Sequence, residues 1–285
     1  MLQSLGTVRA VAAAASMSPS AVSAQLAALE AESGVALLER HGRAIALAPA
    51  GDALAAHAVA ILDHIGTAEE DLRSWHEGAT GVVRVGAFTS ALRAFVIDAA
   101  RDVRRDHPGL RVHLDELEPQ ETVPALTRGA IDLAIVGDFG DGSLPPAAEL
   151  ERTPLATDDL LAVLPPGHRL RGASLDLRAL RDEPWLLDGT DLERHVVLLC
   201  RRAGFEPARA GRLSSHGSLM LGVAAGLGVT VLPAFAIDPA YAVRTCRLRP
   251  AARRELIALT RAGAARRRSI AVTRDAIAAA AAALG

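Results

Sequence analysis

Residues 18–30 carry the most specific pattern of the chain and read SPSAVSAQLAALE. A serine followed by a proline is a typical helix start, because Ser18 can cap free backbone N–H groups and Pro19 suits the first helical position. Apolar residues recur every three or four positions and so share one helical face: Val22, Leu26 and Leu29. The stretch predicts an amphipathic helix with small polar residues in its first turns and an end near Gly34.

Short segments on both sides complete a small domain. The alanine-rich segment 8–15 predicts a helix before this stretch, and residues 37–47 predict two short strands around a turn at Gly42. Two helices across a tight turn, followed by a hairpin, form the outline of a winged helix-turn-helix.

A regular apolar pattern follows in residues 52–77. Its apolar positions step alternately by four and three: Leu54, Ala58, Ile61, Ile65, Ala68, Leu72 and Trp75. Such a heptad seam is typical of paired helices, and we expect a homodimer through this helix, with a tetramer as the larger alternative. The other interpretation is an ordinary amphipathic helix packed on its own domain. Residues 78–81 predict a linker.

Beyond residue 81 the pattern changes to alternating strands and helices. The first set contains strands at 82–86, 110–117 and 131–136 and helices at 91–105 and 121–128. This βαβαβ order predicts a mostly parallel sheet covered on both faces. The second set and the tail contain strands at 160–164, 185–187, 229–232 and 256–260 and helices at 195–203, 219–225 and 275–284. The fold class expected for this region is α/β.

Composition narrows the function classes. The chain has 285 residues, a formal net charge of −2, and no lysine among its 31 cationic residues, which excludes a polybasic binder that works through bulk charge. Its two cysteines, Cys200 and Cys246, exclude a disulfide framework and a four-thiolate zinc site.

Because nucleotide-binding, metalloprotease and hydrolase motifs are missing from the sequence, we expect no enzyme, no catalytic residue, no metal and no cofactor. Lack of a signal peptide or apolar span predicts a cytoplasmic protein with no membrane partner.

The helix at residues 18–30 closely resembles the recognition helix of LysR-type transcriptional regulators. The match continues at the family's spacing through Gly34, Leu37, Glu39-Arg40, Gly42, Leu47 and Pro49-Ala50-Gly51. Weaker marks extend over nearly the whole chain: Pro108, Leu126-x-x-Gly129-x-x-Asp132, Gly204-Phe205-x-Pro207 and Ala225–Val229. The resemblance implies a winged helix-turn-helix head, a long linker helix and a two-lobed effector domain of the periplasmic-binding-protein type.

Pattern and resemblance together divide the chain into three parts. We expect a DNA-binding domain at residues 1–51, a linker and dimerisation helix at 52–78, and an effector-binding domain at 82–285. The resemblance also implies that residues 1–5 make only the last turn of the head's first helix, so we expect that helix to be truncated. Within the effector domain, lobe 1 is expected at 82–157 and 251–285, and lobe 2 at 158–250. The crossings between the lobes, near 157–158 and 247–250, would act as hinges.

The predicted recognition helix has the chemistry for double-stranded DNA. Its small polar first turns leave room in the major groove, where the helix dipole and free N–H groups can hold a phosphate. Gln25 can bond to a phosphate or to a base edge, with adenine as the best match, and Arg43 at the hairpin tip suits a phosphate or a narrow minor groove. We expect DNA contacts from Ser18, Pro19, Ser20, Ser23, Ala24, Gln25, Arg40 and Arg43. Without the resemblance, a solvated serine-rich face and a lone surface arginine would be favoured.

The charge of the head limits how it can bind. Residues 1–62 hold three arginines and four acidic residues: Arg9, Arg40, Arg43, Glu30, Glu32, Glu39 and Asp52. Few cations release few counterions, so a single head should bind weakly, and assembly is needed to multiply contacts. Ala24 also stands where the family often has a longer polar or basic residue. The alternative function is a small-molecule binding protein with a vestigial head that does not bind DNA.

The resemblance implies an effector site between the two lobes. Ligands of open α/β sheets bind at the carboxyl ends of strands, and the first strand leads into hydroxyl side chains at a helix N-terminus, where a carboxylate can be held. We expect effector contacts from Thr89, Ser90, Gly137, Asp138, Thr190 and His216. Helix capping is the competing role for Thr89 and Ser90, and a purely structural role is favoured for Thr190 and His216.

Arginines gather near the C-terminus. Residues 244–274 hold ten arginines against one acidic residue, Glu255. Contact with DNA or an acidic partner is one interpretation. We favour a solvated surface of the α/β region.

Overall fold

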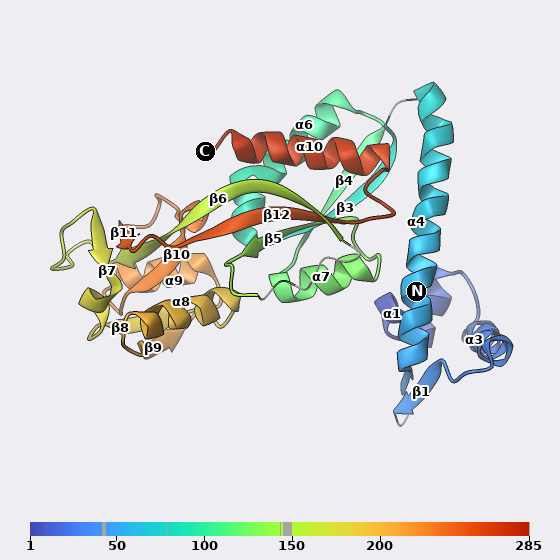
Figure 1. The fold of residues 1–285 in the computed structure, drawn as a ribbon, viewed down its shortest axis with the longest axis horizontal. Coiled ribbons are helices and arrows are strands. Elements are labelled where there is room, and N and C mark those ends of the chain that lie inside the picture. The colour runs from blue at the N-terminus through green and yellow to red at the C-terminus, as the bar shows by residue number, and fades with distance from the viewer. Residues whose placement is uncertain (42–43, 78, 143, 145–149, 285) are drawn as a thin grey trace.

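The computed structural model describes residues 1–41, 44–77, 79–142, 144 and 150–284 (Figure 1). A small head opens the chain, with elements α1 (Leu2–Leu5), α2 (Val8–Ala14), α3 (Pro19–Ser33), β1 (Leu38–His41) and β2 (Ala44–Leu47). The two strands pair antiparallel, with Leu38 opposite Leu47. The winged helix-turn-helix predicted from the sequence is confirmed, while the expected hairpin tip at Gly42 and Arg43 lies outside the described residues.

Local chemistry explains the ends of α3. The Ser18 hydroxyl accepts a hydrogen bond from Ala21 N at 3.1 Å, and Gly34 ends the helix at φ +70°, a conformation that favours glycine. A small core holds the head together: Leu2, Val11, Ala12 and Val22. Leu29, expected on the apolar face, is 44% exposed, because the 15-residue α3 extends past the 7-residue α2 that covers it.

Helix α4 (Pro49–Glu77) runs for 29 residues and contains the whole predicted heptad pattern of residues 52–77. At Gly51 a Cβ atom would lie 2.1 Å from the carbonyl oxygen of Leu37, the residue before β1, so glycine is required for the first turn of α4 to lie against this part of the head. The helix then stands beside the α/β region as a single long rod (Figure 1).

The two faces of α4 differ. Opposite the heptad seam, Asp63 is buried and pairs with Arg261 (Oδ1 to Nη2, 3.0 Å) and with Arg267 (3.2 Å), which fastens α4 to the α/β region. Six seam residues are exposed: Leu54, Ala58, Ile61, Ile65, Ala68 and Leu72. The seventh, Trp75, has a side chain outside the described part of the structure. The seam is therefore not the face that packs on the helix's own domain.

Lobe 1 combines a parallel sheet with one antiparallel strand. Its elements are β3 (Gly81–Ala87), α5 (Thr89–Ala91), the π-helical turn η1 (Leu92–Val96), α6 (Ile97–Asp106), β4 (Leu110–Glu116), α7 (Pro119–Thr127), β5 (Leu133–Asp138), β12 (Arg253–Arg261) and α10 (Arg268–Ala282). Strand β3 pairs parallel with β4 and β5, as predicted, and β12 lies antiparallel to β5. The apolar side chains of α6 and α10 pack on one face of this sheet and those of α7 on the other.

Lobe 2 has its own core around Trp185, Leu219 and Met220. Its elements are β6 (Leu150–Leu164), which also belongs to lobe 1, β7 (Ser174–Asp176), η2 (Leu177–Leu180), β8 (Pro184–Leu187), α8 (Asp191–Arg202), β9 (Ala208–Arg212), α9 (His216–Ala224), β10 (Thr230–Pro233), η3 (Ala234–Ala236) and β11 (Arg244–Arg249). Strands β10 and β11 are antiparallel to β6, whereas β7 pairs parallel with β11 and β8 pairs parallel with β9.

The two lobes share strand β6. Strand β6 pairs with β12 up to Asp159 and then with β10 and β11 from Leu160 to Leu164, so the sheet continues from one lobe into the other (Figure 1). Only residues 160–164 of β6 were predicted as a strand. No helix in the described ranges is long and apolar enough to cross a membrane.

The C-terminal arginines do not all lie on a solvated surface. Arg254 and Arg261 are only 6% and 7% exposed, and each is paired with a carboxylate. The interpretation of this segment as solvated is wrong for these two residues, because β12, on which they lie, runs through the middle of the sheet.

Candidate functional site

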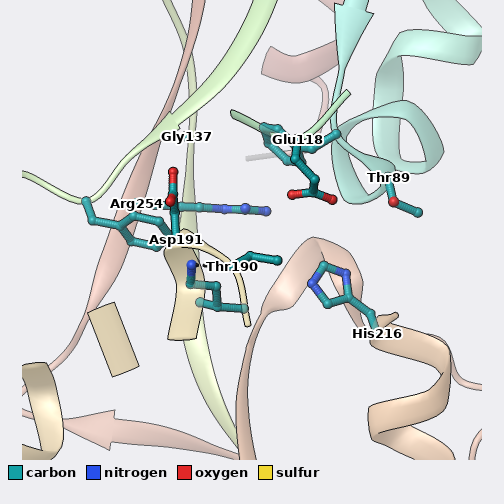
Figure 2. A pocket seen from close by; sticks show the side chains of 10 residues that line it. Thr89, Glu118, Gly137, Thr190, Asp191, His216 and Arg254 are labelled. Carbon is teal, nitrogen blue, oxygen red and sulfur yellow. Dashed lines mark hydrogen bonds between the residues drawn. The ribbon is translucent and has the colours of Figure 1, made fainter. Parts of the chain in front are cut away.

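A cleft lies between the lobes at the carboxyl ends of β3 and β5 (Figure 2). From lobe 1, residues just after β3 and at the end of β5 reach it, together with Glu118 before α7. From lobe 2 come the first turn of α8 and His216 at the start of α9. The lining residues are Phe88, Thr89, Glu118, Gly137, Phe139, Thr190, Asp191, Leu192, His216 and Arg254.

Arg254 supplies a buried cation to this cleft. Its Nη2 donates to Asp158 Oδ2 at 2.7 Å and to Ser90 Oγ at 2.8 Å, and its guanidinium lies 4.6 Å from the Phe88 ring centroid. Burial lowers the pKa of Arg254 and raises the pKa of Asp158, while the charge of each opposes the shift of the other. An arginine paired with a carboxylate keeps its charge at neutral pH, so the cleft contains a fixed positive group.

Two further titratable groups point toward the same space as Arg254 (Figure 2). Burial, followed by repulsion from Asp188 and other nearby carboxylates, raises the pKa of Glu118. Burial lowers the pKa of His216; the charge of Asp188 opposes this shift, and the charges of Arg254 and Arg93 add to it. The cleft therefore favours the uncharged form of both side chains, beside one permanent cation.

Four of the predicted effector contacts are brought together at the cleft: Thr89, Gly137, Thr190 and His216. Ser90 lies directly behind it as the hydrogen-bond partner of Arg254. Asp138 is not among the residues that line the cleft. Its Oδ1 accepts a hydrogen bond from Gly140 N at 2.8 Å within the turn that follows β5.

Competing roles are visible for two of the hydroxyls. Thr190 caps α8 by accepting from Leu192 N, and it donates to Asp188 Oδ2 at 2.9 Å. Thr89 caps no helix, and its hydroxyl donates to Glu116 instead. Thr190 is therefore a helix-capping residue, whereas Thr89 is not.

The sequence did not point to Arg254 or Glu118. Arg254 was one of ten arginines in a segment interpreted as surface, and Glu118 stood between a strand and a helix without a motif. Alternation along β12 places Arg254 on the same face as the buried Leu256, but it equally places Arg253 on the face of the apolar Ile257, so the sequence pattern alone did not distinguish the two arginines.

The predicted DNA contacts on α3 are all exposed: Ser18, Pro19, Ser20, Ser23, Ala24 and Gln25. The Ser18 and Ser20 hydroxyls lie 2.9 Å apart at the start of the helix. The Arg40 backbone belongs to β1, but its side chain and the whole of Arg43 lie outside the described residues. Glu30 is occupied within the head, because its Oε1 accepts from Leu37 N and Leu38 N.

A winged head on a long helix, joined to two lobes around a polar cleft, defines a ligand-responsive DNA-binding regulator. The family model of the LysR substrate binding domain matches residues 76–282, and that of the bacterial regulatory helix-turn-helix protein of the LysR family matches residues 2–52. The chain belongs to the LysR family of transcriptional regulators, with a DNA-binding helix-turn-helix and an effector-binding domain.

Relatives and solved structures agree with this assignment. The chain is 34% identical over 269 residues to a probable hydrogen peroxide-inducible genes activator of Streptomyces viridosporus, covering 90% of this chain and 84% of the relative. It is 30% identical to the HTH-type transcriptional regulator YnfL of Escherichia coli K12, over 78% and 75% of the two chains. Full-length OxyR of Pseudomonas aeruginosa, solved as a variant, matches with a TM-score of 0.75 at 25% identity, over 97% and 92%.

Proposed function

We propose that this regulator responds to a small organic anion, such as a carboxylate, bound in the cleft between its lobes. The buried Arg254 guanidinium at the cleft carries the proposal. Helices α8 and α9 both begin at this cleft, and the partial positive charge of a helix N-terminus favours an anion. The cavity at the cleft has a volume of only about 30 Å³ in this arrangement, room for little more than a water molecule, so the lobes must move apart to admit a metabolite.

Binding there would act on lobe closure. Arg93 of lobe 1 pairs with Asp238 of lobe 2 at 2.7 Å, and Phe95 meets Phe235 edge-on with ring centroids 6.4 Å apart. These contacts and the shared strand β6 form the joint between the lobes. An anion that bridges Arg254 and the first turn of α8 would favour the closed arrangement.

At the other end of the molecule, α3 is proposed to enter the major groove through its exposed first turns, with Gln25 reading a base edge. The seam of α4 would pair two chains, so that two heads bind two half-sites. In this proposal residues 1–51 bind DNA, 52–78 link and pair, and 82–285 bind the effector, with lobe 2 at 158–250.

Peroxide sensing, named for the Streptomyces relative, is not the function that this chain's cysteines support. Cys200 is fully buried, and burial raises the pKa of its thiol to about 12, so the reactive thiolate is scarce at neutral pH. Cys246 is also buried, and its Sγ–H donates to the Gly172 carbonyl oxygen. An effector recognised without thiol chemistry is therefore favoured.

DNase footprinting of the operator region with full-length protein tests DNA binding. Protection of a dyad-symmetric site is expected, and Gln25→Ala should weaken it by about tenfold, the value of a lost base contact. Glu32→Gln, at the far end of α3, should leave the footprint in place. A folded dimer that protects no site at any concentration would instead support the vestigial-head alternative.

Calorimetric titration with acetate, succinate and benzoate, each compared with its neutral amide, tests the effector class. At least one acid should bind and its amide should not. Thr89→Val should weaken binding of that acid, whereas Thr127→Val, on the exposed side of α7, should not. Amides that match their acids would contradict the proposal.

A further inference from the structure

A second cavity lies outside the cleft, where the chain passes between the lobes. This hinge pocket is formed by the start of η2, one side of α8 from His195 to Arg202, and residues 248–253, which run from the end of β11 to the start of β12. Its cavity volume is about 450 Å³, within the range of small-molecule sites.

The charges of the hinge pocket are strongly unbalanced. It is lined by four arginines and one acidic residue: Arg178, Arg202, Arg249, Arg253 and Asp176. Asp176 lies 4.0 Å from Arg178. Within the described part of the chain, the other three arginines form no ion pair with a carboxylate, so the pocket has a surplus of positive charge available to a ligand.

Apolar side chains form the rest of the wall: Phe139, Leu177, Leu199 and Leu248. The Phe139 ring stacks on His195, with centroids 4.5 Å apart and planes at 19°. The His195 ring is 5% exposed, and its Nδ1 has no hydrogen-bond partner among the described residues, lying 3.8 Å from Asp141. Apolar surface beside free guanidinium groups suits a molecule with both an apolar body and an anionic end.

The hinge pocket is separate from the cleft. Successive residues of β12 point to opposite faces, so Arg254 is buried at the cleft while its neighbour Arg253 is exposed at the hinge pocket. Phe139 is the residue that lines both cavities.

We propose that the hinge pocket is a second ligand site, which binds an aromatic or branched aliphatic acid with its anionic group on Arg249 and Arg253. The two arginines approach the pocket from the segment that joins the lobes. A ligand bound to both would hold that segment in one arrangement.

The probe for the test is 4-bromobenzoate, whose bromine gives an anomalous diffraction signal. Crystals of the full chain soaked with it are expected to show a bromine peak in the hinge pocket, whether or not the cleft also binds it. In solution the Arg249→Gln/Arg253→Gln variant should lose about tenfold or more in affinity at this site, the value of lost charge-assisted hydrogen bonds. The matched control is Arg247→Gln on β11, an exposed arginine outside the pocket, which should bind as the wild type does.

Two results would overturn the proposal. One is a bromine peak in the cleft alone or in neither cavity. The other is a double variant that unfolds at the wild-type temperature and binds the probe with wild-type affinity. Thr89→Val separates this site from the cleft, because it should weaken cleft binding without changing occupancy of the hinge pocket.

Discussion

The Arg254 side chain contributes both to the stability of the fold and to the proposed effector site. Replacing it with glutamine leaves Asp158 buried without its counter-charge, and breaking a buried pair in this way costs about 3–5 kcal/mol. We expect Arg254→Gln to lower the free energy of unfolding by that amount, measured by urea denaturation of the full chain. Arg253→Gln, one residue away but exposed, should change it by less than about 0.5 kcal/mol.

A double variant separates charge from packing at this position. Arg254→Met combined with Asp158→Leu removes both charges and should restore part of the lost stability, since apolar replacements of buried pairs are often tolerated. Equal losses in the single and double variants would show that the pair does not account for the effect.

Glu118 gives a prediction about pH. Its pKa is raised above the ordinary value near 4.5, mainly by burial, so the folded chain holds this proton more tightly than the unfolded chain does. The stability that Glu118 contributes is therefore present below pH 4.5 and is lost as pH rises through the raised pKa. The urea midpoint of Glu118→Gln should equal that of the wild type at pH 4 and should be higher than that of the wild type at pH 7.5. If the midpoints of variant and wild type differ by the same amount at both pH values, the prediction is contradicted.

At the scale of elements, α4 offers a matched pair of alanines. Ala58 lies on the heptad seam and Ala56 lies off it, and both are exposed. A glutamate at position 58 would place like charges against each other in a paired helix, so we expect Ala58→Glu to yield monomers in light scattering. Ala56→Glu should remain dimeric.

Loss of helix pairing should also weaken DNA binding. Because two linked heads gain about 10²–10⁴ in apparent affinity over one, Ala58→Glu should bind the operator at least about 10²-fold more weakly than Ala56→Glu. Dimers formed equally by both variants would place the interface elsewhere.

The sequence predicts an element well when the residues that determine it lie close together along the chain. Helix α3 was predicted from Ser18, Pro19 and Gly34, which act within a few residues. Thr89 and Thr190 were placed at the cleft by a similarly local rule, since side chains after strands meet at one edge of a sheet. Strand β6 was only partly predicted, because its first ten residues pair with β12, about a hundred positions later. Arg254 could not be separated from its neighbours without knowing which face of β12 is buried.

At the scale of the whole molecule, the distribution of charge predicts a weak response to salt. Each head carries three arginines within residues 1–62, so a pair of heads neutralises at most about six phosphates. The plot of log affinity against log salt for the operator should therefore have a slope no steeper than about −5. A filter-binding series in potassium chloride measures it, and a slope near −10 would mean that arginines outside the head also contact DNA.

The anchorage of α4 at Asp63 has a mechanical consequence. From Asp63 to the start of α4 at Pro49 the helix rises about 21 Å without interruption. If the pair with Arg261 acts as a fulcrum, a swing of about 10° displaces the head by about 4 Å, close to the rise of about 3.4 Å per base step along one strand. We therefore expect α4 to work as a lever arm, which converts a small adjustment at the lobes into a shift of about one base pair in the spacing of two heads.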